Sequence, residues 1–113
     1  MNARNLLTKA PPYEVEEGIR RLGKNLRTAR LRRNLTIALV AQKIGTGPRA
    51  VMDAEKGKLS TGIAVYAALL WTYGLLHPFQ DLADPATDSA GLALDQLGGR
   101  ERARTFKGLD NDF

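Results

Sequence analysis

The 113-residue sequence contains no cysteine and few aromatic residues. Without cysteine, the chain has no disulfide framework, thiolate zinc site, cysteine nucleophile or iron–sulfur ligand. Aromatic residues make up 6% of the chain and apolar residues 43%, so Leu, Ile, Val and Ala must build the core, as in a small helical domain. The length is that of one domain with tails. We therefore expect an all-α fold.

No segment carries the marks of export or of a membrane span. Residues 1–12 contain Arg4 and Lys9, but no apolar run follows them, so a secretory signal is not expected. Residues 59–80 contain no charged residue, which makes a membrane helix the obvious alternative to a buried one. Polar residues, glycines and Pro78 dilute this stretch below the ~20 strongly apolar residues that a span requires. We expect a cytoplasmic protein without a membrane segment.

Signals for catalysis and metal binding are also scarce. His77 is the single histidine, and no Ser or Cys nucleophile pattern lies beside it. Residues 45–47, Gly-Thr-Gly, lack the Lys and Ser/Thr of a phosphate-binding loop. Three aspartates lack the spacing of an EF-hand loop: Asp81, Asp84 and Asp88. We expect no enzymatic activity, no metal and no cofactor.

Charge is distributed unevenly along the chain. Residues 20–58 hold eleven lysines and arginines against Asp53 and Glu55, a net charge of +9, although the whole chain carries only +5. Residues 77–99 hold four aspartates and no lysine or arginine. A polyanion such as nucleic acid is the natural partner of the basic block. The acidic block favours another partner or solvent.

Apolar spacing predicts a long first helix over residues 13–33. The apolar residues recur at steps of three and four and so line one helix face: Val15, Ile19, Leu22, Leu26 and Ala29. Gly18 and Gly23 each weaken this helix by ~1 kcal/mol relative to alanine, so a start near Ile19 is the alternative. Residues 1–12 end in two prolines and are expected to form a flexible arm.

Capping residues place the shorter helices. Asn34 ends the first helix in a tight turn, and Thr36 caps a second helix that ends at Gly45. Its expected inward residues are Val40, Ala41 and Ile44. Gly47 and Pro48 open a third helix that runs to about Lys56, with Val51 and Ala54 inward and Gly57 as its exit.

Two further helices complete a predicted domain over residues 13–83. The charge-free residues 63–70 predict a fourth helix buried on most of its circumference, and a short fifth helix ends near Ala83. Asp84 and Pro85 break the pattern, and residues 91–94 form one apolar turn. We expect residues 84–113 to be a C-terminal extension that is partly disordered.

The second and third helices carry the motif with the clearest functional meaning. Residues 36–45 read TIALVAQKIG, residues 49–57 read RAVMDAEKG, and an apolar helix follows. Residues 22–70 thereby resemble the phage-repressor (Xre-type) helix-turn-helix domain. The resemblance implies a small five-helix bundle that binds double-stranded DNA, with the third helix in the major groove and the second across the backbone.

The same resemblance assigns base-contacting positions to the start of the third helix. The matching residues are Gly47, Pro48, Arg49, Met52 and Asp53. Arg49 has the donors for a bidentate contact to guanine, and Met52 suits a thymine methyl group. Asp53 either accepts from cytosine N4 or only solvates the helix.

In this family an arginine of the first helix pairs with the glutamate that ends the reading helix. The matching residues are Arg30 and Glu55. A partly buried carboxylate needs a cationic donor, so the pair would be structural. The alternative is that both are solvated surface charges.

Phosphate contacts are expected around the start of the second helix. Ile37 and Leu39 replace the family's glutamine and glutamate, so side-chain clamping there is lost. The Thr36 hydroxyl and the backbone N–H groups from Ile37 onward remain for phosphate. Nearby basic residues complete the expected set: Arg33, Lys43, Lys56 and Lys58. Ile37 and Leu39, both assigned to the outward side, alternatively mark a protein contact.

A narrower similarity spans most of the chain. Residues 11–13 (PPY), 30–36 (RLRRNLT), 67–71 (AALLW), 82–85 (LADP) and 91–94 (GLAL) resemble HipB-like antitoxins. This similarity implies a homodimeric repressor that binds a pseudo-palindromic operator, regulates its own operon and holds a HipA-like kinase toxin. Residues 59–76 are the expected dimer face, since they carry no charge. The alternative is a protein-interaction module with weak, non-specific DNA binding.

Overall fold

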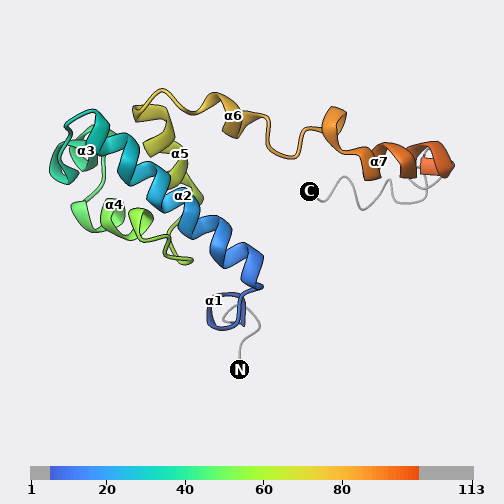
Figure 1. The fold of residues 1–113 in the computed structure, drawn as a ribbon, viewed down its shortest axis with the longest axis horizontal. Helices are drawn as coiled ribbons and strands as arrows, with labels where there is room; N and C mark the ends of the chain where they lie inside the picture. The colour runs from blue at the N-terminus through green and yellow to red at the C-terminus, as the bar shows by residue number, and fades with distance from the viewer. Residues whose placement is uncertain (1–5, 100–113) are drawn as a thin grey trace. The chain divides into compact units, whose positions relative to one another are not determined.

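A computed structural model describes residues 6–99, and its secondary structure there is entirely helical (Figure 1). The helices are α1 (Leu6–Lys9), α2 (Tyr13–Arg32), α3 (Ile37–Ile44), α4 (Pro48–Glu55), α5 (Ile63–Thr72), α6 (His77–Gln80) and α7 (Ser89–Leu94), with two further turns, η2 (Pro85–Thr87) and η3 (Asp95–Gly99). Over these residues the expected all-α class is confirmed.

The predicted count of five helices is wrong, because α1 and α7 add to it. Four and six residues are too few to display a helical repeat in the sequence. Local hydrogen bonds form both turns: the Ala10 amide donates to the Leu6 carbonyl at 2.8 Å, and the Gly91 amide donates to the Asp88 side chain at 2.9 Å. The flexibility expected of residues 1–5 and the disorder expected of residues 100–113 concern positions outside the described residues.

Helix α2 begins at Tyr13, so the alternative start near Ile19 is wrong. Its first turn carries Glu14 and Glu16, which interact favourably with a helix N-terminus. The helix ends at Arg32, and Asn34 then adopts a left-handed backbone with φ of 55°. This turn directs the chain into α3.

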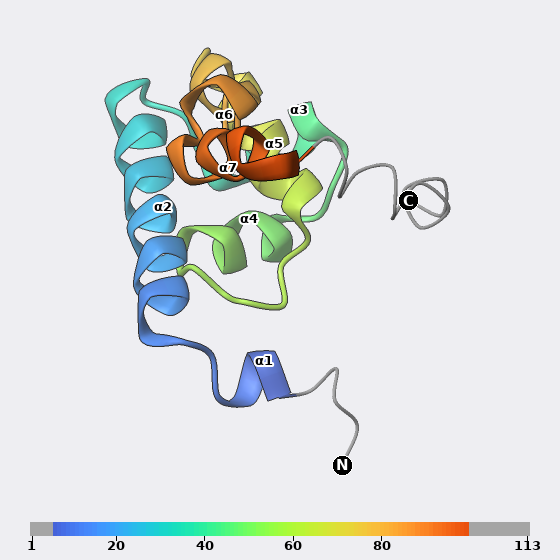
Figure 2. The same cartoon turned by 90° about the vertical axis from the view of Figure 1, so that its right-hand side faces the viewer.

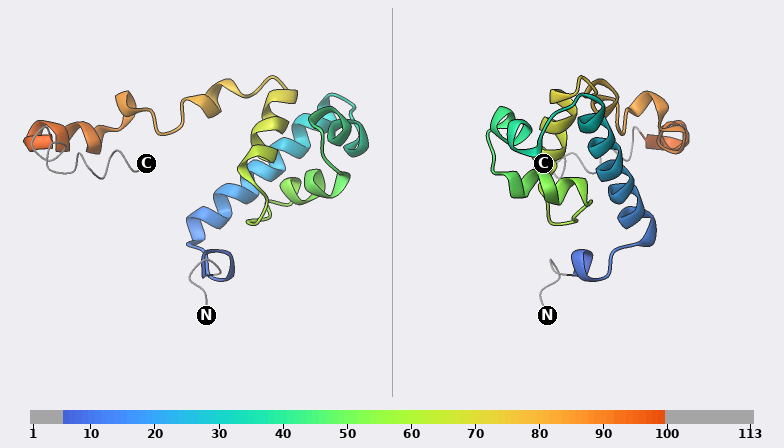
Figure 3. Two further views of the ribbon diagram at one scale, coloured as in Figure 1. Left: turned by 180° about the vertical axis from the view of Figure 1, so that it is seen from behind. Right: turned by 60° about the vertical axis from the view of Figure 1, so that its left-hand side comes forward.

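The core lies where α2, α3, α4 and α5 meet. Helix α4 contacts the other three, and α3 also contacts α5. Figures 2 and 3 show α3 and α4, joined by a short turn, lying together on one side of α2. The buried apolar side chains of this core are Leu26, Ala29, Val40, Ala41, Val51, Ala54, Tyr66, Leu69 and Tyr73.

Helix α5 is less buried than its composition predicts. Tyr66 and Leu69 are its buried residues, whereas Ile63 is 70% exposed and Trp71 is 58% exposed. The expectation of burial on most of the circumference is therefore only partly confirmed: Ile63, Ala64 and Trp71 are exposed, and the remaining positions outside Tyr66 and Leu69 are half-buried. Helix α5 packs against α3 and α4.

Among the described residues, 6–80 form one compact unit and 81–99 belong to a second. The sequence placed this division after residue 83. Asp84 accepts a hydrogen bond from the Ala86 amide at 2.9 Å and so begins η2. On the following turns Leu92, Leu94 and Leu97 are exposed.

Candidate nucleic-acid interface

Helix α4 presents a polar stripe on the side opposite the core. Val51 and Ala54 are completely buried, whereas Arg49 and Lys56 are exposed and Met52 and Asp53 are partly buried. Met52, Asp53 and Lys56 lie three, four and seven residues after Arg49, which places the four residues on one face of the helix. The Arg49 side chain is 80% exposed, so its guanidinium is available to a ligand.

The N-terminus of α4 is open. Gly47 precedes the helix and Pro48 occupies its first position, and no side chain caps them. Both residues are exposed, and a β-carbon on Gly47 would meet no atom within 4 Å. Another molecule can therefore approach the backbone closely at this end of α4.

The structure brings Arg30 and Glu55 together as the sequence predicts. Arg30 Nε donates to Glu55 Oε2 at 2.6 Å, Nη2 donates to Oε1 at 3.0 Å, and Nη1 donates to the Leu35 carbonyl at 3.0 Å. Both side chains are more than nine-tenths buried. The hydrogen bond that Arg30 donates to Glu55 raises the pKa of Arg30, outweighing the opposite effect of burial. This pair fixes the end of α4 to α2 and to the turn before α3.

Asp53 lies between two cations of its own chain. Its Oδ1 is 3.8 Å from Arg49 Nε, and its Oδ2 is 3.6 Å from Lys58 Nζ. The Asp53 side chain is only 20% exposed. The sequence predicted that Asp53 either accepts a hydrogen bond from a cytosine or only solvates the helix. The structure adds a third arrangement, in which Asp53 forms ion pairs within its own chain.

The start of α3 is capped by its own threonine. Thr36 Oγ1 accepts from the Leu39 amide at 3.1 Å, which leaves the hydroxyl hydrogen to donate elsewhere. Leu39 is 56% exposed, as expected, and Lys43 is exposed in the last turn. The outward assignment of Ile37 is wrong, because its side chain is partly buried and packs against the core.

Ile37 instead helps to form a small cavity beside α4. The cavity measures about 240 Å³ and has Ile37 and Met52 as its apolar lining. Arg27, Lys56 and the ion pair of Arg30 complete it. Sequence reasoning did not single out Arg27, since nothing within the charge run of α2 distinguishes it. Only the packing of α4 on α2 shows that it lies beside Met52.

Comparison of the chain with protein-family models, curated proteins and solved structures finds no match. Among residues 6–99 no helix is both long and apolar enough to cross a membrane. The same residues contain no group of three or more His, Cys, Asp or Glu side chains placed to share a metal ion.

Arg33, an exposed residue among the predicted phosphate contacts, also makes contacts within the fold. Its Nη1 donates to the Ala29 carbonyl and its Nη2 to the Tyr73 carbonyl, both at 2.9 Å. The guanidinium also lies 5.6 Å from the centre of the Tyr73 ring, within cation–π range. Arg33 thus joins the end of α2 to the end of α5, which sets it apart from the other expected phosphate contacts.

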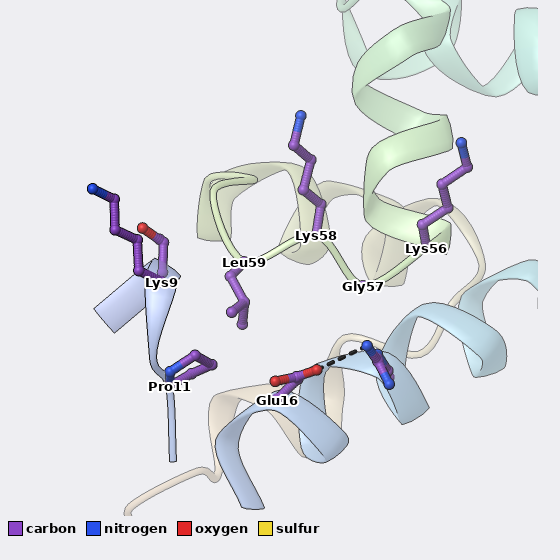
Figure 4. Close-up of a pocket in the computed structure, with 9 residues that line it drawn as sticks. Lys9, Pro11, Glu16, Lys56, Gly57, Lys58 and Leu59 are labelled. Atoms are coloured by element: carbon purple, nitrogen blue, oxygen red, sulfur yellow. Dashed lines mark ion pairs between the residues drawn. The ribbon is translucent and has the colours of Figure 1, made fainter. Parts of the chain in front are cut away.

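A basic pocket of about 480 Å³ lies where α1, α2 and the loop after α4 meet. Figure 4 shows Pro11 and Leu59 in its interior, with the amino groups of Lys9, Lys56 and Lys58 extending outward around it. Below them Glu16 pairs with Arg20 at 2.8 Å. The sequence assigned Lys9 to a flexible arm and gave no signal that it would lie near the other two lysines.

Proposed function

We propose that the protein is a sequence-specific, double-stranded-DNA-binding transcriptional repressor in which α3 and α4 act as a helix-turn-helix. The observation that carries this proposal is the outward stripe of α4, with an 80% exposed Arg49 on a helix held by the buried Arg30–Glu55 pair. A rigid helix with an exposed arginine at its open N-terminal end suits the reading of base edges in a major groove.

Each part of the surface has a role in this proposal. Arg49 donates to O6 and N7 of guanine, and Met52 contacts a thymine methyl group. The Thr36 hydroxyl and the first N–H groups of α3 bind phosphate, assisted by Lys43, Lys56 and Lys58. Lys9 and Arg27, which flank the surface in the folded chain, extend the same set.

The proposed repressor is a homodimer that uses α5. Ile63 and Trp71 project from the side of α5 that no other helix of residues 6–80 covers, and residues 59–80 carry no charge. Two copies with strongly basic domains repel each other least across such a face. A two-fold dimer requires a pseudo-palindromic operator with half-sites ~34 Å apart.

Sedimentation equilibrium tests the proposed dimer. The wild type should be dimeric and Trp71→Glu should be monomeric at the same concentration. A monomeric wild type would contradict the proposed dimer.

We further propose that this repressor is the antitoxin of a HipA-like kinase and regulates their shared operon. The acidic unit that follows residue 80, with exposed Leu92, Leu94 and Leu97, supplies apolar contacts for a protein partner. A kinase gene beside this one and co-purification of the two products test this proposal. Failure to co-purify with such a kinase would contradict it and leave the repressor proposal standing.

Fluorescence anisotropy tests the DNA-binding function. The wild type should bind the duplex upstream of its own gene far more tightly than a scrambled duplex. Arg49→Ala should lose about 10- to 100-fold on the upstream duplex, because one bidentate base contact contributes roughly 1–3 kcal/mol. Arg21→Ala is the control of equal charge, since Arg21 lies with Tyr13 and Glu17 along α2. It should affect both duplexes equally and weakly.

Equal, weak and steeply salt-dependent binding of the wild type to both duplexes would contradict the proposed function. That result would favour the interaction module, whose partner a pull-down would then identify. The exposed Leu39 and the apolar pocket beside it, lined by Leu35, Val40 and Thr72, are the surface in favour of this second candidate.

A further inference from the structure

The two cations nearest Asp53 differ in how firmly they are placed. Lys58 is held by its backbone: its amide donates to the Asp53 carbonyl at 3.0 Å, and its carbonyl accepts from the Tyr66 hydroxyl at 3.0 Å. Arg49 has a long, exposed side chain that approaches the Asp53 carboxylate to 3.8 Å. Asp53 itself is four-fifths buried. The carboxylate is therefore the fixed member of the pair and Arg49 the adjustable one.

The contact geometry leaves the reading edge of Arg49 open. The closest approach of Asp53 to the guanidinium is 3.8 Å, at Nε, which is too long for a hydrogen bond. Because the Arg49 side chain is 80% exposed, its two terminal amino groups stay accessible to a ligand. Those amino groups supply two parallel N–H donors, the pair that fits O6 and N7 of one guanine. A carboxylate behind Nε thus orients the guanidinium without occupying the donors that read the base.

The same carboxylate opposes phosphate binding at the two cations. A phosphate that approaches Arg49 or Lys58 comes within a few ångströms of a negative charge, well inside the screening length of ~8 Å at physiological salt. Asp53 acts as an internal counterion, so fewer bound ions are released from DNA when these residues meet phosphates. Guanine edges carry no net charge, so the opposition falls mainly on non-specific contacts.

We propose that Asp53 is a specificity-determining positioning residue: it orients Arg49 for one base edge and weakens the phosphate attraction of Arg49 and Lys58. This inference rests on the proposed DNA-binding function. It assigns Asp53 a role other than acceptance from cytosine N4. It also gives a role to a largely buried carboxylate within residues 20–58, which carry a net charge of +9.

The test compares Asp53→Asn with Glu14→Gln, which makes the same change in net charge at an exposed position on α2. Anisotropy is measured on the upstream and scrambled duplexes across a salt series. Asp53→Asn should bind scrambled DNA several-fold more tightly, with a salt slope steeper by about one to two. The ratio of specific to non-specific affinity should fall at least 10-fold. Asp53→Glu, which keeps the carboxylate, should recover most of that ratio.

Two background variants separate the effects. When Asp53→Asn is added to Arg49→Ala, the ratio of specific to non-specific affinity should no longer change, because the guanidinium that Asp53 orients is absent. When Asp53→Asn is added to Lys58→Gln, the same ratio should still fall. Thermal unfolding followed by circular dichroism establishes that each variant is folded.

Failure of the inference is distinguishable from failure of the proposed function. A wild type that does not discriminate between the duplexes contradicts the function itself. A discriminating wild type with an Asp53→Asn variant of unchanged ratio and slope overturns the inference alone. So does a loss confined to one C·G base pair, which would show direct readout of cytosine by Asp53.

Discussion

Gly23 in α2 and Gly57 after α4 lie so close that neither position has room for a side chain. A β-carbon on Gly23 would lie 2.8 Å from the Gly57 backbone nitrogen, 2.6 Å from the Ala54 carbonyl oxygen and 2.7 Å from that of Glu55. A β-carbon on Gly57 would lie 2.6 Å from Cα of Arg20. Gly57 also has a φ of 70°, which favours glycine. This backbone contact seats the end of α4 on α2.

Gly23→Ala should destabilise the protein, whereas Gly18→Ala should stabilise it. The overlapping atoms at Gly23 are backbone and cannot move aside independently, so the expected loss is about 1–3 kcal/mol in the free energy of unfolding. A β-carbon on Gly18 meets nothing within 4 Å, and the gain in helix propensity should be about 0.5–1 kcal/mol. Urea unfolding measures both. A stabilising Gly23→Ala would refute the close approach.

Two buried tyrosines should respond in opposite ways to the loss of their hydroxyl groups. The Tyr73 hydroxyl is buried without a hydrogen-bond partner among the described residues, so Tyr73→Phe should raise the free energy of unfolding by about 1 kcal/mol. The Tyr66 hydroxyl donates to the Lys58 carbonyl at 3.0 Å, so Tyr66→Phe should lower it by a similar amount. Thermal unfolding of the two variants checks the signs, and changes of equal sign would contradict this account.

Stability should fall at alkaline pH. Burial raises the pKa of both Tyr66 and Tyr73 above the usual value of about 10. A group whose pKa is raised by folding contributes its full stabilisation below the unfolded-state value and loses it as the pH rises through the folded-state value. The free energy of unfolding should therefore decrease above pH ~10, and less so in Tyr73→Phe. An identical decrease in wild type and Tyr73→Phe would contradict the assignment to Tyr73.

Substitutions of Arg33 and Lys43 should have different effects, because Arg33 has a structural role and Lys43 a proposed phosphate-binding role. Arg33→Met removes two hydrogen bonds to carbonyl groups and the contact with the Tyr73 ring, so we expect a loss of about 1 kcal/mol in stability. Its salt slope for DNA binding should stay near that of the wild type. Lys43→Gln should leave stability nearly unchanged and reduce the slope by about 1. The reverse pattern would return Arg33 to the phosphate-binding set.

Much of the helical domain follows from local sequence rules. Apolar spacing over residues 13–33 predicts α2, Thr36 and Gly45 delimit α3, and Pro48 begins α4. These features depend on a few neighbouring residues, through the helical repeat, the capping hydrogen bond and the left-handed exit. The pairing of Arg30 with Glu55 was accessible because a family resemblance supplied the long-range relationship that spacing lacks.

The sequence by itself determined where the main helices lie and which of their faces are apolar, since periodicity and capping act within a single helix. Only the tertiary structure distinguishes Gly23 from Gly18, because the backbone at the end of α4 approaches Gly23 and leaves space around Gly18. The tertiary structure also shows that Ile37 packs against the core and that Arg33 donates to the Tyr73 carbonyl. In the same way, it places Asp53 between Arg49 and Lys58. Each of these outcomes depends on the distance between separate helices, which packing fixes and no local pattern encodes.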